Sequence, residues 1–249
     1  MKSPTVFWPV VAVLWRRELI RFWRERARVL GFVGSPLVFW FAVGSGFGDL
    51  AYYFPGALTM TVMFSAVFST MSLIEDRREG FLLAVLASPA SRCGLVMGKI
   101  LGSSTLAWIQ GMAFLAFAPL ARFRLGLLDL LAVAAVLALT AVTFTALGFF
   151  FAWRMESTQG FHAVINLLLV PLWLVSGAVF PITSAHVWMQ VLMTVNPMTY
   201  ALAALRATLA PAAGGPALAI SVAVTLVCAL VLVAASVSTA TRRAAGGVA

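Results

Sequence analysis

The residue types that most often carry out catalysis or bind metals are few and scattered in this chain. It has two histidines, His162 and His186, and two cysteines, Cys93 and Cys228. None of them lies near a cluster of further Cys, His, Asp or Glu with the spacing of metal ligands. Cysteines this far apart indicate neither a disulfide framework nor a metal site. We therefore expect no catalytic residue, no metal and no cofactor in this chain.

Gly94, Gly98 and Lys99 have a partial likeness to a phosphate-binding loop. Such a loop needs four residues between its glycines, then Lys, and then a Ser or Thr that binds magnesium. Here three residues separate the glycines, and Ile100 follows the lysine. The spacing and the missing hydroxyl both exclude a nucleotide-binding loop at this position.

One polar segment, residues 75–92, has the character of a docking element. It begins with a dense run of mixed charges from Glu75 to Glu79, and Gly80 then precedes a short apolar stretch that starts at Phe81 and stops before Pro89. A short helix with an apolar face suits the groove of a partner protein, and the charges beside it can fix its register. The residues alone leave open a second interpretation, in which this helix lies on the membrane surface.

This segment must be positioned by a membrane domain, because the composition excludes a soluble protein. The chain is 62% hydrophobic and 10% charged, with a mean hydropathy of +1.02, whereas soluble domains are about 25% charged. Its 249 residues can form one all-α bundle of about six transmembrane helices of roughly 20 residues each. No stretch is polar and long enough for a second domain, so we expect residues 29–249 to be a single membrane domain without an attached ATPase.

Runs of apolar residues and helix breakers predict the boundaries of six spans. We expect them at residues 29–47, 52–74, 100–120, 127–151, 161–180 and 217–240. None of these spans carries Asp, Glu, Lys or Arg near its centre, although ion-coupled transporters usually need such groups to bind the coupling ion. If the chain moves a solute uphill, the energy must therefore come from outside the bundle.

Residues 1–28 form an amphipathic segment before the first span. Arg17, Arg21, Arg24 and Arg28 recur at helical spacing on one stripe, and tryptophans fall mostly on another. A basic helix with tryptophans on its apolar side is typical of the membrane interface. The alternative is a solvated, charged extension of the first span. Because the net charge of +9 is concentrated in such clusters between apolar runs, it indicates contact with membrane lipid rather than nucleic acid.

The distribution of basic residues predicts the orientation. Of the 17 Lys and Arg, all but Arg122, Arg124 and Arg206 fall on the side of the two chain ends, so both termini and residues 75–92 are predicted to be cytoplasmic. Residues 183–209 are apolar but interrupted by Asn196-Pro197. We expect two short helices dipping into the outer leaflet there, because a seventh span would place the C-terminal arginines outside.

Three blocks of this sequence resemble the permeases of type-2 ABC exporters, the group that includes drug-resistance, polysaccharide and lipooligosaccharide exporters. Residues 54–102 contain FPGALTMTVMFSAVFSTMSLIEDRREG, SPASR and GKILG; residues 154–181 read RMESTQGFHAVINLLLVPLWLVSGAVFP; residues 196–206 begin with NPMTY and end with LR. The blocks occur in the order of the family, and the resemblance covers nearly the whole chain.

The resemblance implies a set of roles. Residues 1–28 would be an elbow helix along the cytoplasmic membrane face, and a coupling helix between the second and third spans would contact a separate ATPase that binds ATP and magnesium. Two permeases and two ATPases would form the transporter. The implied ATPase contacts are Glu75, Asp76, Arg77, Glu79, Gly80 and Phe81. Residues placed by span on the path between the permeases, or at their contact, are Phe64, Phe68, Asn166 and Trp173. The outer re-entrant region includes Asn196, Pro197 and Tyr200.

These observations predict the permease subunit of an ATP-driven exporter in a bacterial plasma membrane, itself without enzymatic activity. The apolar and aromatic residues of the path-lining spans favour an amphipathic or lipid-like solute over a sugar chain. Two other readings stay open: a stand-alone channel or ion-coupled carrier, and a membrane regulator whose cytoplasmic helix only recruits a partner. The identity of the solute is not predicted.

Overall fold

The computed structural model describes residues 7–24, 26–210 and 216–242. Within these residues every regular element is a helix, which confirms the predicted all-α class for this part of the chain. The elements are α1 (Trp8–Arg24), α2 (Arg26–Gly46), α3 (Leu50–Ser69), α4 (Ser72–Arg78), α5 (Phe81–Ala87), α6 (Arg92–Leu115), η1 (Ala118–Ala121), α7 (Leu127–Ala152), α8 (Thr158–Trp173), η2 (Leu174–Ala178), η3 (Ile182–Ser184), α9 (Val187–Val195), α10 (Pro197–Leu209) and α11 (Leu218–Arg242).

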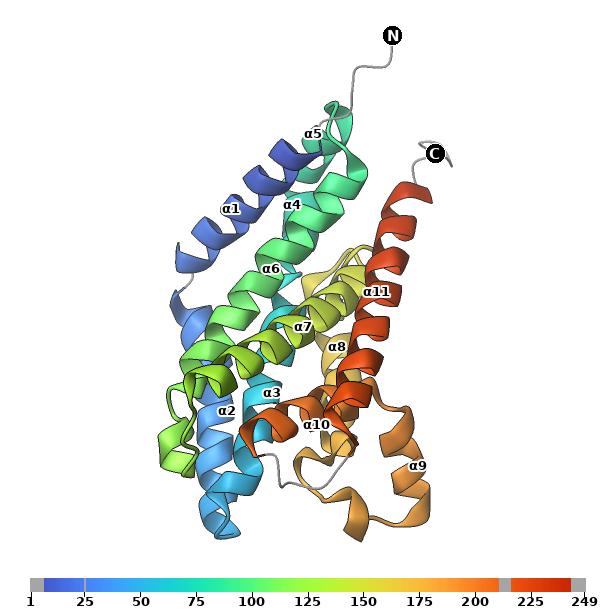
Figure 1. Ribbon diagram of the computed structural model, residues 1–249. Helices are drawn as coiled ribbons and strands as arrows, with labels where there is room; N and C mark the ends of the chain where they lie inside the picture. The colour runs from blue at the N-terminus through green and yellow to red at the C-terminus, as the bar shows by residue number, and fades with distance from the viewer. Residues whose placement is uncertain (1–6, 25, 211–215, 243–249) are drawn as a thin grey trace.

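The long helices pack side by side into one bundle whose two ends differ (Figure 1). One end carries α5, the beginning of α1 and the end of α11. The opposite end carries α9, α10 and the turn between α2 and α3. We call these the α5 end and the α9 end. The predicted cytoplasmic elements therefore gather at one end of the bundle, and the predicted outer elements gather at the other.

Four helical stretches in the described residues are long and apolar enough to cross a membrane. They are Leu50–Arg78, Leu127–Ala152, Thr158–Ala178 and Leu218–Thr241, and a shorter apolar helix covers Val33–Gly46. The chain is thus a multi-pass membrane protein. The predicted total of six requires α2 and α6 as well. At 1.5 Å per residue, the 24 residues of α6 extend about 36 Å, but the helix carries Arg92 and Lys99 in its first third.

The helix α3 lies at the centre of the bundle. In the apolar window of Leu50–Arg78, 89% of the residues are buried, compared with 17% for Leu218–Thr241. Trp40 of α2 is fully buried against Phe54 of α3, with ring centroids 5.1 Å apart, and its indole nitrogen donates to the carbonyl of Leu50. α3 is therefore enclosed by its own chain, whereas α11 leaves most of its apolar surface to lipid or to a partner.

Two helices differ most from the spans predicted for them. The helix in the place of the third predicted span, α6, begins at Arg92 instead of residue 100, and the Ser91 hydroxyl caps its first turn by accepting from the backbone N–H of Gly94 at 3.3 Å. The fifth does not remain helical to residue 180. It unwinds in η2, where Val175 leaves helical geometry and Gly177 takes a φ of +91°, a conformation that glycine adopts readily.

Candidate functional site

The predicted coupling segment forms a compact turn of two short helices at the α5 end (Figure 1). α4 continues the direction of α3 after a turn at Thr70. Gly80 then reverses the chain with a φ of +77°, and α5 follows until Ser88 takes an extended conformation before Pro89. Leu83 of α5 is 64% exposed. The predicted short apolar helix is therefore present, and part of its apolar face is uncovered.

A cluster of charged side chains fixes α4 to α1 and α6. We call it the ionic anchor; its members are Arg17, Glu18 and Arg21 of α1, Glu75 and Asp76 of α4, and Lys99 of α6. Arg17 binds both carboxylate oxygens of Asp76, at 2.7 and 2.8 Å. The Lys99 ammonium donates to Glu18 at 2.5 Å and also to Asp76. Three positive and three negative groups thus balance one another.

The centre of the ionic anchor is shielded from solvent. Glu18, Asp76 and Lys99 are 3%, 0% and 3% exposed. The second oxygen of Glu18 accepts a hydrogen bond from the Ser72 hydroxyl at 2.9 Å, so both carboxylate oxygens of Glu18 accept a hydrogen bond. Buried charges are tolerated only when they are paired and hydrogen-bonded, and removing one partner of such a pair typically costs about 3–5 kcal/mol. The cluster therefore holds three helices in one arrangement.

Three glycines on α6 allow α1 to approach it closely. Gly94, Gly98 and Gly102 recur every four residues and lie on one face of the helix. A Cβ atom on Gly98 would lie 2.9 Å from the Cβ of Leu14, and one on Gly102 would lie 2.8 Å from the Cβ of Glu18. These glycines serve helix packing, which accounts for a spacing that does not fit a phosphate loop.

Arg77 and Arg78 tie the other side of α4 to the segment after α7. Arg77 donates to the backbone carbonyls of Trp153 and Met155, at 2.7 and 2.9 Å. Arg78 donates to the carbonyl of Glu156 at 3.1 Å. With the ionic anchor, these bonds connect α4 to α1, α6 and the end of α7. A displacement of α4 must therefore move these helices or break the bonds.

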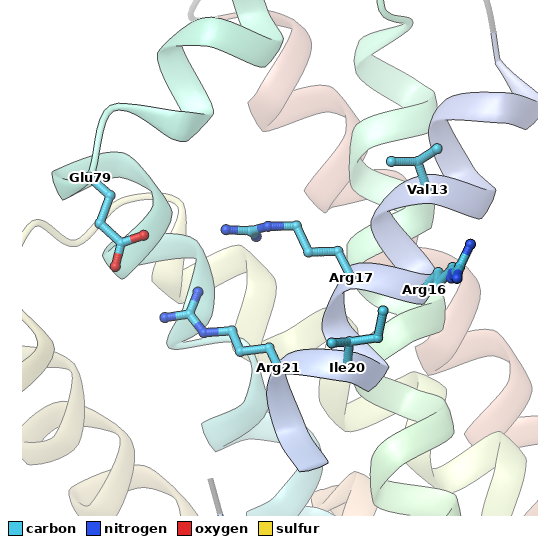
Figure 2. A pocket seen from close by; sticks show the side chains of 6 residues that line it. All are labelled: Val13, Arg16, Arg17, Ile20, Arg21 and Glu79. Atoms are coloured by element: carbon cyan, nitrogen blue, oxygen red, sulfur yellow. The ribbon is translucent and has the colours of Figure 1, made fainter. Parts of the chain in front are cut away.

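An open groove of about 540 Å³ lies between α1 and the coupling segment (Figure 2). Its lining residues are Val13, Arg16, Arg17, Ile20, Arg21 and Glu79. Arg17 and Arg21 extend from α1 toward the side of the groove that carries Glu79 (Figure 2). The guanidinium of Arg17 also lies 3.9 Å above the Phe81 ring, so one side chain joins the ionic anchor to the start of α5. The groove offers a partner both charged and apolar groups.

The six predicted ATPase contacts lie in different environments. Glu79 is exposed, and Gly80 and Phe81 are partly exposed. Glu75 and Arg77 are partly buried and already bound within the chain. Asp76 is fully buried and orients α4 through its bonds to Arg17 and Lys99. For all six residues, contact with an ATPase remains a prediction.

Sequence reasoning missed two central members of the ionic anchor. Glu18 and Lys99 are 81 residues apart, so no local pattern joins them. Two signals were present: Glu18 is one of only two acids in the basic segment 1–28, and Lys99 stands at the edge of a long apolar run. A charged residue in or beside an apolar helix usually has a partner of opposite charge. A search for opposite charges on different segments could therefore have suggested the pair of Glu18 and Lys99.

The predicted path residues also separate into two groups. Phe64 is partly exposed, and Asn166 is exposed on α8. Phe68 is 5% exposed and its ring lies 5.9 Å from that of Phe64, while Trp173 is 4% exposed and its indole N–H donates to the carbonyl of Gly56 at 2.8 Å. Trp173 thereby attaches α8 to α3, and a place on the path or at a dimer contact remains a prediction for all four residues.

At the α9 end, Asn196 separates α9 from α10, as the Asn-Pro break predicted. Its side-chain oxygen caps α10 by accepting from Met198 N–H at 2.9 Å, and Pro197 occupies the first turn. Its amide nitrogen donates to the carbonyls of Leu172 and Val175, at 2.6 and 3.1 Å. Tyr200 donates to the carbonyl of Thr194. The break therefore fixes α10 to the end of α8.

The unwound carbonyl of Gly177 is held by two further side chains. Arg206 of α10 donates to it at 2.8 Å, and Tyr52 of α3 donates to it at 3.1 Å. The Arg206 guanidinium also lies 4.6 Å from the centre of the Tyr52 ring. α3, η2 and α10 therefore meet at one carbonyl group, a junction that sequence periodicity could not indicate.

This fold, with several membrane spans and a short helix anchored at one end, is that of a multi-pass membrane protein. A family model described as "ABC-2 type transporter" matches residues 9–210, and the chain belongs to this family. The resemblance seen in the sequence is thereby confirmed. Membership makes the chain a transmembrane subunit of an ABC transporter and implies an ABC ATPase subunit as its partner.

Relatives with assigned names agree with the family. Nodulation protein J of Rhizobium leguminosarum bv. viciae is 25% identical over 244 residues, which are 92% of each chain. The transport permease ycf38 of Cyanophora paradoxa is 26% identical over 208 residues, covering 78% of this chain and 72% of its own length. The doxorubicin resistance ABC transporter permease protein DrrC of Mycobacterium tuberculosis is 24% identical over 214 residues, 81% of this chain and 76% of its own.

Proposed function

We propose that this chain is the permease subunit of an ATP-driven exporter, and that a separate ATPase docks at the α5 end. The observation that carries the proposal is the coupling segment itself. α5 exposes Leu83 beside a groove with charged walls, and α4 at its base is bonded to α1, α6 and the end of α7. A partner that pushes on α5 would therefore move spans and not only a loop.

The proposed topology has six spans, with α2 and α6 added to the four apolar stretches, and both chain ends in the cytoplasm. The excess of Lys and Arg on that side supports this orientation, and so does the gathering of α5 and the described chain ends at one end of the bundle (Figure 1). Trp8 and Val13 of α1, which are 74% and 64% exposed, suit an elbow helix with one face in lipid. The proposed location is a bacterial plasma membrane.

The proposed transporter contains two copies of this chain and two ATPases, and the solute leaves the cytoplasm along α3 and α8. The exposed face of α8 supports this arrangement. Leu167 and Val170 on that face are 78% and 41% exposed, so it is free to face a second copy or a solute. The junction of η2 with α10 would close the path at the outer side. An apolar face with aromatic rings on α3 favours an amphipathic solute.

A substitution on α5 tests the docking site. With its ATPase co-expressed, Leu83→Arg should abolish co-purification of the two subunits and transport-coupled ATP hydrolysis, because a charge replaces the apolar contact. Leu120→Arg is the matched control, since Leu120 is 56% exposed in η1 at the α9 end. Wild-type complex formation by Leu83→Arg would refute the docking site.

The alternative of a stand-alone channel or ion-coupled carrier makes a different prediction. It requires solute flux by the purified chain in proteoliposomes without any ATPase. The buried charges of the ionic anchor argue against it, because Glu18 and Asp76, its two buried acids, are both already bound to Lys99 and so are not available to a coupling ion. Flux without ATPase, driven by an ion gradient, would replace the proposal with this alternative.

A further inference from the structure

An open hollow of about 290 Å³ lies at the α9 end, where the end of α6, η1 and the start of α7 meet (Figure 1). We call it the η1 hollow. Every side chain that lines it is apolar; Met112, Pro119, Phe123, Leu125 and Leu130 are among them. A hollow with apolar walls holds water poorly, so we expect an apolar group to fill it.

The η1 hollow lies where a membrane span ends. Leu127–Ala152 is long and apolar enough to cross a membrane. Its first turns are apolar on the outside as well, because Leu127, Leu128 and Leu131 are mostly exposed, and so is Leu120 of η1. An exposed apolar surface of this kind on a membrane protein suits contact with hydrocarbon. The residues just before Leu127 should then lie at the level of the lipid headgroups.

The loop after η1 forms one rim of the hollow and carries two arginines. Its side chains alternate: Phe123 and Leu125 line the hollow and are partly buried, whereas Arg122 and Arg124 are exposed. The ring of Phe123 lies 5.6 Å from that of Phe54 in α3, which fixes the loop to the bundle. A rigid rim therefore presents two guanidinium groups beside an apolar hollow.

Neither arginine is neutralised by an acid of this chain. Within the described part of the chain, no hydrogen bond or ion pair involves the side chain of Arg122 or Arg124. The acid nearest to them in the sequence is Asp129, whose carboxylate accepts from the backbone N–H of Gly126 at 3.0 Å and caps α7. Both guanidinium groups are therefore available to an anion from outside the chain.

The backbone at Arg122 is unusual for an arginine. Its φ of +64° is the only positive value at a residue other than glycine among the described residues. Arg122 closes η1 as a left-handed cap: its N–H donates to Pro119, and the N–H of Phe123 donates to Ala118. Glycine is the usual residue at such a cap, because a side chain there is strained. Strained positions cluster at ligand-binding sites, so the strain indicates a use for this side chain.

We propose that the η1 hollow binds an anionic phospholipid, with an acyl chain in the hollow and the phosphate held by Arg122 and Arg124. Guanidinium groups bind phosphate well, because their N–H groups match its oxygen atoms. Two arginines exceed the single charge of Asp129, so a net negative head fits better than one that also carries an ammonium group. A soluble phosphate would leave the apolar hollow uncovered. The site requires only a membrane-spanning chain, and it is independent of the proposed export function.

Photolabelling of the full chain in phosphatidylcholine nanodiscs tests the site. The probes are phosphatidylglycerol and phosphatidylcholine with a diazirine at the same position of the same acyl chain, each present at a low fraction. The phosphatidylglycerol probe should label residues 112–130 several-fold more than the phosphatidylcholine probe. Arg122→Gly and Arg124→Gln should each reduce this labelling about tenfold, the loss of roughly one charge-assisted hydrogen bond. Arg154→Gln, exposed beyond the other end of α7, is the control and should leave it unchanged.

Two variants separate lipid binding from folding. Glycine relieves the strained backbone at position 122, so Arg122→Gly should keep the wild-type unfolding temperature or raise it while labelling falls. Ala116→Trp fills the hollow from its lining and leaves both arginines in place. It should also reduce labelling, because the acyl chain loses its space.

Four results would overturn the inference. Equal labelling by the two probes would show that the site does not select an anionic head, and wild-type labelling of both arginine variants would show that the arginines do not bind it. Displacement of the probe by soluble glycerol phosphate would show that the arginines bind a soluble anion. If the arginine variants separate a dimer and keep their labelling, the rim contacts a second copy.

Discussion

At the scale of single residues, Lys99 is the group on which the ionic anchor depends most. Its ammonium donates to Glu18 of α1 and to both Ser72 and Asp76 of α4, while Lys99 itself belongs to α6. Arg17 and Arg21 retain some exposure, with 29% and 23% of their side chains accessible to solvent, so water can substitute for part of the hydrogen bonds that they make. Lys99 is buried, so water cannot substitute for its hydrogen bonds.

Lys99→Met should therefore destabilise the chain strongly, because two buried carboxylates lose their shared cation. We expect the free energy of unfolding to fall by about 3–5 kcal/mol, measured as a lower unfolding temperature in detergent. The double variant Glu18→Gln with Lys99→Met should recover part of this loss, since Asp76 still has Arg17 and Arg21. Arg124→Met, at an exposed position, is the control. Equal unfolding temperatures for Lys99→Met and Arg124→Met would disprove the role of Lys99.

At the scale of elements, α1 belongs to the bundle as firmly as a span does. Val11, Leu14, Glu18 and Phe22 are its buried side, and they lie every three or four residues. Because membrane helices gain little from burying apolar groups away from lipid, close packing and polar bonds must hold them together. The glycine face of α6 supplies the close packing, and the ionic anchor supplies the polar bonds.

Gly98→Val tests this packing. The added methyl groups would meet Leu14 and the backbone of Val11, whose atoms lie 2.9 and 3.1 Å from an ideal Cβ. Overpacking of this kind costs about 1–3 kcal/mol, and hydrogen exchange in α1 should become faster. Gly34→Val is the control, since nothing lies within 4 Å of a Cβ there. If both variants exchange α1 amides at the wild-type rate, the close approach is not needed.

The elements themselves were largely predictable, because apolar runs and helix breakers are local signals. α7 begins at its predicted residue, and α5 begins at Phe81 after the glycine turn. The helix predicted from residue 100 begins eight residues earlier, at Arg92, because Lys99 is paired with Glu18 and Asp76 and the helix continues through it. The junction of Arg206 with Gly177 was not predictable, since it depends on where α8 unwinds and on which distant side chains reach the freed carbonyl.

At the scale of the whole molecule, the two ends of the bundle are closed by different chemistry. The α5 end is joined by charge pairs, whose strength depends on exclusion of water. The α9 end is joined by donors that reach backbone carbonyls freed by η2: Asn196 binds Leu172 and Val175, while Arg206 and Tyr52 bind Gly177. A membrane interior offers such carbonyls no water, so releasing them requires another donor. The α9 end should therefore resist opening until the bundle rearranges.

Arg206→Met tests this closure. Hydrogen bonds from charged groups are worth about 1.5–3 kcal/mol, so the amides of Leu174–Ala178 should exchange with solvent roughly 10- to 100-fold faster. The effect should stay at the α9 end, because the ionic anchor at the α5 end shares no residue with this junction. Tyr52→Phe removes a weaker, uncharged donor from the same carbonyl and should give a smaller increase. Faster exchange in α4 and α1 as well would show that the two ends open together. Unchanged exchange in Leu174–Ala178 would show that Arg206 does not hold the α9 end closed.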